Sequence, residues 1–587
     1  MLSCLRFAVL IPVSFALTGI AFCQGIATGN LPAVPRAKSS GVPFRASFTD
    51  VAREAGLTAK FVQGDPARKK YIVEANGTGV AYIDYDNDGR LDVFLVNGSR
   101  LEPFPKGQEP VSHLYRNTGS GKFTDVSAAA GITRPGWGNG VCAGDFDNDG
   151  NEDLFVTYWG PNSLYRNNGK GSFEDVAVQA GVAGPNDEWT TGCSFLDYDR
   201  DGKLDLIVAS YVAFDPKTTP LPGAHPYCMF RDKPVFCGPR GLPHGMVTLY
   251  HNQGDGTFVD VSAASGVRKP EGFYAFTVAA ADLNADGWVD VYIACDSTPS
   301  LFFRNNRDGT FTELATEAGI AYNENGTEQA GMGVAIADYD NDGGIDVTKT
   351  NFSEDYPNLY RSAGKGFFED RSVTAGLAVN PGYLLWGVGL EDLDNDGLRD
   401  VFQVAGHVYT GISAISPGLS YASPRLVYRQ LPGGKFEDVS ALAGPGVAAS
   451  HSSRGAAFGD FDNDGDVDVL IMNMDEPPSL LRNDLQGDHR WIAVKLRGIT
   501  SNRSAIGAVV ELKAGGFSQK ASVLSQSSYL SVNDGRLHFG LGAAEKIDSI
   551  VVHWPSGGVE EFSGASPNSL VLLTEGKGTA ERVELVK

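Results

Sequence analysis

The chain has 587 residues and a formal net charge of −23 at neutral pH. A hydrophobic content of 42% and an aromatic content of 10% are those of a folded protein, which excludes a disordered acidic tail. Because a chain this acidic has no basic face to neutralise phosphates, we expect neither nucleic acid nor an anionic membrane as a partner. The length predicts two or more domains, or one large repeat array.

The first 23 residues are typical of a secretory signal peptide. Arg6 precedes an apolar run, and the segment ends at Cys23, after which we expect cleavage. A buried N-terminal helix is the alternative, and the bulky Phe22 disfavours a lipid anchor on Cys23. No other stretch is long and apolar enough to span a bilayer. We therefore expect an exported protein, secreted or in the periplasm or cell envelope, with residues 24–47 as a flexible leader.

Three signatures recur seven times along residues 48–486. The first is an aspartate-rich loop: DYDNDGRLD (84–92), DFDNDGNED (145–153), DYDRDGKLD (197–205), DLNADGWVD (282–290), DYDNDGGID (338–346), DLDNDGLRD (392–400) and DFDNDGDVD (460–468). An apolar strand follows each loop, and then comes a second signature of the LYRN type (114–117 in the first repeat). The third signature, of the FTDV type, begins at Phe48, Phe123, Phe173, Phe258, Phe311, Phe368 and Phe436.

The signatures are out of phase, because the array begins on the third and ends on the second. A closed ring explains this offset, since the first strand can complete the last repeat. Each repeat supplies about four short strands, which is the composition of a β-propeller blade. The sequence therefore predicts an all-β fold with a seven-bladed propeller at 48–486, in which residues 48–51 form the outer strand of the last blade.

Each aspartate loop predicts a cation site. Positions 1, 3, 5 and 9 carry side-chain oxygens, position 7 can add a backbone carbonyl, and the glycine at position 6 allows a sharp turn. Hard oxygen ligands in this number suit Ca²⁺ better than Mg²⁺. An EF-hand would need a glutamate at position 12 and flanking helices, and neither is present in the sequence. The predicted ligands are Asp84, Asp86, Asp88, Arg90 and Asp92; Asp145, Asp147, Asp149, Asn151 and Asp153; Asp197, Asp199, Asp201, Lys203 and Asp205; Asp282, Asn284, Asp286, Trp288 and Asp290; Asp338, Asp340, Asp342, Gly344 and Asp346; Asp392, Asp394, Asp396, Leu398 and Asp400; and Asp460, Asp462, Asp464, Asp466 and Asp468.

The charge of the chain agrees with bound metal. Seven Ca²⁺ ions would add 14 positive charges and bring −23 to about −9. We expect up to seven structural ions, with affinities in the ~10⁻⁴–10⁻³ M class of extracellular modules. The alternative is a set of solvated acidic turns without metal.

Export permits disulfides, and Cys228 and Cys237 are the pair that we expect to be bridged. The other three cysteines of the mature chain, Cys142, Cys193 and Cys295, are expected to be buried thiols. Beyond residue 486, apolar or alternating segments at 491–496, 508–513, 521–525, 550–554 and 570–573 predict a small β-sandwich or barrel at 487–587.

These motifs carry a resemblance. The repeats resemble the FG-GAP/VCBS repeats of integrin-α-type propellers over 48–486. The tail resembles the ASPIC/UnbV domain through RWIAVKLRG (490–498), SNRSAIGAVVEL (501–512), HFGLG (538–542) and VVHWPSG (551–557). Together with CGPRGLP (237–243) and AGHVY (405–409), they resemble the cartilage-acidic-protein-like family of exported proteins. The resemblance implies calcium binding and export, and it supplies no catalytic residues.

The blade topology predicts two different faces of the propeller. The metal loops lie on one face, and the insertions 214–247 and 408–424 lie on the other. On that second face we expect a ligand surface formed by Trp137, Trp189, Tyr274, His407 and Arg454. The alternative is that the aromatic side chains fill the central channel of the ring.

Two function classes follow from these observations. The first is a calcium-binding, non-enzymatic binding, adhesion or scaffold module for a protein or glycan. The second is a polysaccharide lyase or hydrolase on the propeller face, for which Glu188, His244, His407 and Arg454 are the available side chains. Nucleophile-elbow, P-loop, zincin and dinucleotide motifs are absent from the sequence.

Overall fold

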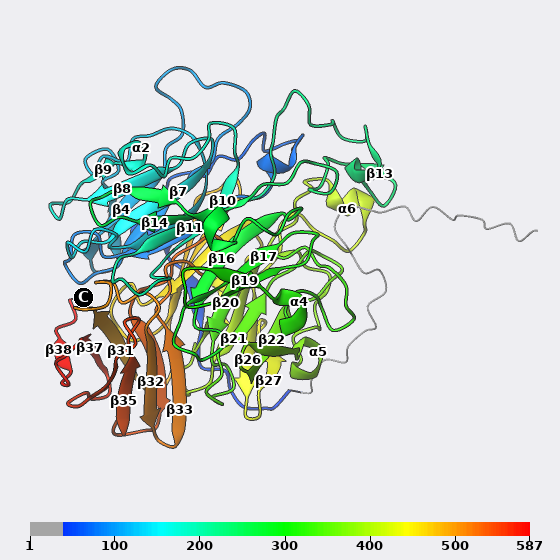
Figure 1. Ribbon diagram of the computed structural model, residues 1–587. Helices are drawn as coiled ribbons and strands as arrows, with labels where there is room; N and C mark the ends of the chain where they lie inside the picture. The colour runs from blue at the N-terminus through cyan, green and yellow to red at the C-terminus, as the bar shows by residue number, and fades with distance from the viewer. Residues whose placement is uncertain (1–38, 587) are drawn as a thin grey trace, which may run out of the picture.

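The computed structural model describes residues 39–586, so the predicted signal peptide and most of the leader lie outside the described residues. Seven four-stranded antiparallel sheets are arranged in a ring (Figure 1). The innermost strand of each sheet packs beside that of the next, from β2 through β6, β10, β16, β20 and β24 to β28, which returns to β2. The predicted all-β propeller is confirmed. Within residues 39–586, no helix has the length and apolar character needed to cross a bilayer.

The strands of the seven sheets follow the repeats of the sequence. In chain order, with β1 closing the last sheet, they are β2–β5 (Val80–Ile83, Asp92–Leu95, His113–Gly119, Lys122–Asp125); β6–β9 (Trp137–Gly144, Asp153–Trp159, Ser163–Asn167, Phe173–Asp175); β10, β11, β14 and β15 (Thr190–Leu196, Asp205–Ser210, Val247–Asn252, Phe258–Asp260); β16–β19 (Ala275–Ala281, Asp290–Cys295, Leu301–Asn305, Phe311–Glu313); β20–β23 (Val334–Ala337, Asp346–Lys349, Asn358–Gly364, Phe367–Asp370); β24–β27 (Leu385–Glu391, Asp400–Ala405, Leu426–Leu431, Lys435–Asp438); and β28–β30 with β1 (Ser453–Gly459, Asp468–Asn473, Ser479–Asn483, Phe48–Asp50).

The third signature sets the outer edge of each sheet. Its phenylalanine pairs with the last residue of the second signature, as Phe123 does with Asn117. Its acidic residue accepts a hydrogen bond from the backbone two residues later, and this turn starts a one-turn helix in most repeats. These helices are α1 (Ala52–Ala55), α2 (Ala177–Ala180), α3 (Ser262–Ser265), α4 (Ala315–Ala318) and α5 (Ser372–Ala375), each followed by a left-handed glycine.

The first strand closes the ring. β1 pairs with β30 in the register Phe48 to Asn483, as the phase of the signatures predicted. The segment before it, residues 39–47, was expected to be flexible but is bound to the sixth sheet. Ser40 donates to Glu437, and Arg429 donates to the carbonyls of Val42 and Pro43. The segment completes the hydrogen bonding of a buried ion pair between Arg429 and Glu437.

The tail is a sandwich of two four-stranded sheets, as predicted. One sheet has the order β34-β31-β37-β38 and the other β33-β32-β35-β36. Their strands are β31 (Arg490–Arg497), β32 (Val509–Ala514), β33 (Phe517–Ser522), β34 (Leu537–Gly542), β35 (Ser549–His553), β36 (Val559–Phe562), β37 (Ser569–Thr574) and β38 (Glu581–Val583). β31 and β37 are parallel, and the other pairs are antiparallel.

Between β33 and β34, the tail sends a segment into the centre of the propeller. We call residues 525–534 (SQSSYLSVND) the channel segment. The innermost strand of a blade has one unpaired edge, which needs hydrogen-bond partners when it is buried. The channel segment accepts hydrogen bonds from backbone N–H groups of all seven innermost strands, including those of Tyr82, Val141, Cys193, Phe195, Val278, Val334, Val388 and Phe458.

The opposite end of the channel is covered by the two insertions of the propeller. The first insertion contains the short helix η2 (Pro226–Cys228) and the hairpin β12–β13 (Met229–Phe230, Lys233–Pro234), and the second contains α6 (Ile412–Ile415). Figure 1 shows β13 and α6 together, far from the brown-to-red tail sheets. The remaining helices are η1 (Ile72–Glu74), before the first sheet, and α7 (Pro445–Ala448), which packs against β1.

Candidate metal loops

Each aspartate loop joins the innermost strand of a sheet to the second strand and has the same backbone path. The residue at position 4 is left-handed in every loop, with φ between 57° and 61°, and so is the glycine at position 6. Asparagine tolerates this conformation better than most residues and occupies position 4 in five loops. In six loops the position 1 carboxylate accepts hydrogen bonds from the N–H groups of positions 5 and 6, as Asp145 does from Asp149 at 2.9 Å and Gly150 at 2.7 Å, and in the first loop Asp84 accepts from Gly89.

The aspartate at position 9 is buried and fixed by two backbone donors. In the first loop, Asp92 accepts from the N–H of Tyr85 at 3.3 Å and of Asn117 at 2.7 Å. The same bond from the second signature occurs in all seven sheets. The loop is thereby tied to the third strand of its own sheet.

The carboxylates at positions 1, 3 and 9 converge. One oxygen from each lies within 4.8 Å of the others in the groups Asp84–Asp86–Asp92, Asp145–Asp147–Asp153, Asp197–Asp199–Asp205 and Asp338–Asp340–Asp346. In two loops, the arginine of the second signature holds the outer oxygen of position 3: Arg116 contacts Asp86 at 2.7 Å and Arg361 contacts Asp340 at 2.6 Å.

The Oδ1 atoms at position 3 of the loops show whether the residues fit a bound cation. The Oδ1 atoms of Asp86, Asn284, Asp340 and Asp394 are buried, and none has a hydrogen-bond partner among the described residues. Buried acceptors without a partner are rare in proteins, because losing water costs free energy that a new bond must offset. A divalent cation bound by these oxygens would satisfy them, so the residues fit the predicted metal.

The electrostatics of the loops also favour a cation. Burial raises the pKa of Asp92 to about 8, and the charges of Asp86 and Asp84 contribute to the shift. Burial likewise raises the pKa of Asp346 to about 8 and that of Asp338 to about 7. Without metal, these aspartates resist ionisation because they have lost water and face other carboxylates. A divalent ion offsets both effects.

Position 4 connects neighbouring loops into a ring. Its side chain donates to the carbonyl at position 6 of the next loop: Asn148 to Gly202 at 2.9 Å, Asn341 to Gly397 at 3.0 Å, Asn395 to Gly465 at 3.0 Å, Asn463 to Gly89 at 3.2 Å, and Arg200 to Gly287. Asn87 instead reaches the side chain of Asn151. Ala285, in the fourth loop, has no side-chain donor, and there Lys520 of the tail donates to Gly343 at 3.0 Å.

The asparagine of the second signature connects neighbouring sheets. The Nδ2 of Asn117 donates to Leu91 in its own loop at 3.1 Å and to Phe461 in the preceding sheet at 2.9 Å. Asn167, Asn252, Asn305 and Gln430 make equivalent pairs of bonds. This explains why the signature ends in an amide in most repeats.

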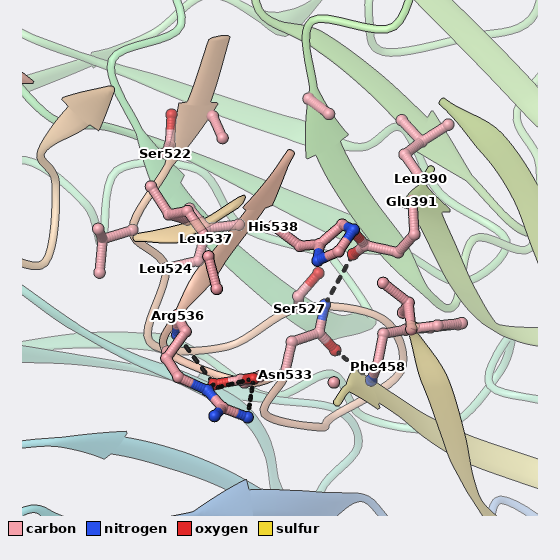
Figure 2. A pocket seen from close by; sticks show the side chains of 18 of the residues that line it. Leu390, Glu391, Phe458, Ser522, Leu524, Ser527, Asn533, Arg536, Leu537 and His538 are labelled. Atoms are coloured by element: carbon pink, nitrogen blue, oxygen red, sulfur yellow. Dashed lines mark hydrogen bonds and ion pairs between the residues drawn. The ribbon is translucent and has the colours of Figure 1, made fainter. Parts of the chain in front are cut away.

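The tail covers the loop face by contacting position 4 residues. The backbone of Arg503 donates to Asn148, the ring of His538 contacts Asn395 at 2.6 Å, and Arg536 donates to Asn463 at 2.6 Å. Figure 2 shows the interdomain cavity of about 90 Å³ beside these contacts, in which Asn533 reaches Phe458 and Arg536 is held by a carboxylate. That carboxylate belongs to Asp534.

The five side chains predicted to form a ligand surface are in the core instead. Trp137, Trp189, Tyr274, His407 and Arg454 are between 0% and 8% exposed. The aromatic residues pack in one cluster with Phe214 and Phe236 of the first insertion, Tyr409 of the second, and Tyr529 of the channel segment. The prediction of a ligand surface was wrong because the insertions fold inward over the channel mouth, so the aromatic residues fill the ring.

The same burial affects the side chains considered for catalysis. The Nη and Nε atoms of Arg454 donate to backbone carbonyls, including Ala75 at 2.8 Å. Burial lowers the pKa of His407 to about 3, so its ring is neutral. Glu188 accepts a hydrogen bond from Ser210, and His244 is exposed. These four residues do not form one open cleft.

The cysteines lie as predicted. Cys228 and Cys237 are bridged and hold the first insertion. Cys142, Cys193 and Cys295 are buried thiols.

Two family models match the chain. FG-GAP-like repeats match residues 84–156, 145–208, 235–293 and 282–348, and the ASPIC and UnbV model matches residues 498–580. The chain is an FG-GAP-repeat protein with an ASPIC and UnbV domain. The repeat matches do not reach the loops at 392–400 and 460–468, although the sheets that carry those loops have the same strand order as the others.

Cartilage acidic protein 1 is similar in sequence to this FG-GAP and ASPIC/UnbV protein. The human protein is 26% identical over 304 residues, which are 51% of this chain and 43% of that protein. The Xenopus tropicalis protein is 25% identical over 491 residues, which are 82% of this chain and 70% of that protein. The chain thus spans less than half the length of the human relative that it matches.

Solved structures align more weakly. A lectin of Agrocybe aegerita that recognises non-reducing terminal N-acetylglucosamine has a TM-score of 0.37 at 15% identity, covering 69% of this chain and 94% of its own. An exotype rhamnogalacturonan lyase has a TM-score of 0.27 at 12% identity, covering 72% of this chain and 90% of its own. With scores below 0.5, the propeller assignment rests on the sheets described above.

Proposed function

We propose that this chain is an exported calcium-binding β-propeller that acts as a binding, adhesion or scaffold module for an extracellular or cell-envelope protein or glycan. The observation that carries the metal assignment is the set of buried, unbonded Oδ1 atoms at position 3 of the loops. Asp86, Asn284, Asp340 and Asp394 each direct one such oxygen into a loop whose other ligands are carboxylates. Positions 1, 3, 5 and 9 would hold the ion in each loop, with the carbonyl of position 7.

The ion supplies charge neutralisation and a link between strands when it is bound. Position 1 ends the innermost strand and position 9 begins the second strand, so one ion ties the two strands together. Up to seven ions would stabilise the loop face on which the tail rests. A structural role of this kind agrees with a non-enzymatic function, since the side chains considered for catalysis are mostly buried or apart.

The signal peptide and the extracellular or envelope location belong to the same proposal. The loops need millimolar Ca²⁺ if they have the affinity typical of extracellular modules, and such concentrations occur outside cells. The disulfide of Cys228 and Cys237 also fits an oxidising compartment.

Metal counting tests the assignment. The mature chain is dialysed against 2 mM CaCl₂, and bound metal is measured by mass spectrometry for the wild type, for Asp86→Ala with Asp340→Ala, and for the matched control Asp255→Ala with Asp308→Ala. We expect about seven ions in the wild type and the control, and about two fewer in the loop variant. Equal counts in the three proteins, or no bound calcium, would contradict the assignment. Asp255 and Asp308 are exposed hairpin residues outside the loops, so they control for lost surface charge.

A further inference from the structure

A second space between propeller and tail lies beside the first two metal loops. We call it the interdomain cleft. It has a volume of about 210 Å³ and lies between loops 84–92 and 145–153 on one side and strands β31, β37 and β38 on the other. It adjoins the interdomain cavity of Figure 2, with which it shares residues 533–536.

One wall of the cleft is apolar. Leu570 and Leu572 of β37 and Val583 of β38 line it, together with Val532 of the channel segment and Leu524, which directly precedes that segment. The β37 and β38 side chains come from one sheet of the tail; Leu570, Leu572 and Val532 are buried, and Leu524 and Val583 are partly exposed. A concave apolar wall with a few polar groups is the usual form of a small-molecule site.

The rim of the cleft carries three cations. Lys495 and Arg497 project from β31, and Arg503 comes from the loop that follows. The nearest carboxylate oxygen to Lys495 is that of Asp84, at 3.8 Å, and Arg497 and Arg503 form no ion pair with any described residue. Because the chain has 71 acidic against 48 basic residues, three cations gathered on one rim, two of them without an ion pair, are unexpected.

The neighbouring interdomain cavity shows the contrast. There Arg399 pairs with Glu391 at 3.5 Å, and Arg536 pairs with Asp534 at 2.7 Å, a pair that also borders the cleft. Both arginines of the cavity are therefore paired within the protein. The cleft, in contrast, combines an apolar wall with Arg497 and Arg503, which form no ion pair with any described residue, and with Lys495, whose partner is Asp84 of the first metal loop.

We propose that the interdomain cleft binds a small organic anion with an apolar body, whose charged group lies on Lys495 and Arg497 and whose body lies on Leu570 and Leu572. The proposal rests on the proposed metal binding, because calcium in the first two loops would neutralise Asp84 and Asp145, which line the same cleft. With those two neutralised and Asp534 paired with Arg536, the three rim cations outnumber the one remaining carboxylate, that of Glu152. An arginine or lysine paired with an anion in a partly buried site gives both affinity and orientation.

A matched pair of probes tests the proposal. The probes are 1-anilinonaphthalene-8-sulfonate, which has the sulfonate, and N-phenyl-1-naphthylamine, which has the same ring system without a charge. Fluorescence titration of the mature chain in 2 mM CaCl₂ compares the wild type, Lys495→Gln with Arg497→Gln, and the control Lys546→Gln with Lys577→Gln. The control residues are exposed lysines of the tail that do not line the cleft.

We expect one saturable sulfonate site in the wild type and the control, at least about tenfold tighter than for the neutral probe. The affinity of the Lys495/Arg497 variant for the sulfonate probe should be about tenfold lower than that of the wild type, and its affinity for the neutral probe should be unchanged. Equal sulfonate affinity in wild type and variant, or no saturable binding, would overturn the proposal. Thermal unfolding of each variant establishes that it is folded. Counting bound calcium on the same samples separates the two proposals. About seven bound ions without sulfonate binding would overturn the anion site and leave the metal assignment intact.

Discussion

At the end of the channel that carries the aspartate loops, the tail domain is held by hydrogen bonds to the loops and by apolar packing against the second and third sheets, whereas the opposite end is covered mainly by apolar side chains from two insertions. The loop end repeats sevenfold, and several hydrogen bonds of the tail there use loop positions that recur in the sequence. The insertion end has no repeat and is held by one aromatic cluster and by ion pairs such as that of Arg240 with Glu328, and one disulfide closes the first insertion on itself. Bound metal should therefore change the stability of the loop end and leave that of the insertion end unchanged.

The channel segment joins the two ends, and its removal should have the largest effect. Tyr529 is fully buried and contacts the rings of Trp386 and Phe276 at 4.9 and 5.7 Å. Tyr529→Ala should lower the free energy of unfolding by about 3–5 kcal/mol, because it leaves a large cavity in the core. Tyr529→Phe removes only the hydroxyl bond to the carbonyl of Asn76 and should cost about 1 kcal/mol. Urea denaturation measures both, and equal losses would contradict a packing role for the ring.

The disulfide tests the independence of the insertion end. Replacing Cys228 and Cys237 by alanine should cost about 2–3 kcal/mol, as expected when a short loop loses its cross-link. Because the bridge lies far from the loops, the loss should be the same in calcium and in EGTA. Urea denaturation in both buffers checks this, and a loss confined to one buffer would show that the two ends are coupled.

The pH dependence tests the loop end without metal. Asp92 and Asp346 have pKa values of about 8 in the folded chain, well above those of an unfolded aspartate. The folded state therefore holds more protons, and its stability falls as pH rises towards 8. In EGTA, unfolding should be easier at pH 8.0 than at pH 6.0 by about 2 kcal/mol for each of these two groups. In calcium the order should reverse, since protons then compete with the ion. A profile identical in the two buffers would count against metal in the loops.

The smallest effects should come from position 4. Asn148→Ala removes the loop-to-loop bond to Gly202 and the bond from the backbone of Arg503 in the tail, and it places alanine in a left-handed conformation, so it should cost about 1–2 kcal/mol. Ala285→Asn makes the reverse change in the one loop that lacks a donor and should gain about 0.5 kcal/mol. Urea denaturation in calcium measures the change in the free energy of unfolding for both variants. A loss on Ala285→Asn would contradict the role assigned to this position.

The parts that could be predicted from the sequence depend on local geometry. The spacing of aspartates and glycine in the loops determines the turn, the convergence of positions 1, 3 and 9, and the direction of the strands on either side. The phase of the three signatures predicted that β1 closes the last sheet. The asparagine at position 4 of the loops also recurs in the sequence. Its hydrogen-bond partner lies in the next loop, however, and only the closed ring brings the two residues together.

The parts that could not be predicted depend on contacts distant in sequence. The channel segment, SQSSYLSVND, has neither strand alternation nor a motif, and its bonding partners belong to seven separate strands. Trp137, Trp189 and Tyr274 were expected at a surface because nothing local shows that the insertions fold over them. The cations of the interdomain cleft likewise border a cleft only because the tail packs against the first two loops, which the sequence does not show.

Calorimetric unfolding of the mature chain in 2 mM CaCl₂ and in EGTA, with bound metal counted before each scan, tests the central claim most directly. We predict about seven bound ions in calcium, none in EGTA, and a large fall in Tm on chelation, because the loops that support the tail lose their ions. An unchanged Tm with one or two ions bound would mean that the aspartate loops are held by their hydrogen bonds alone, which would contradict a metal-stabilised ring.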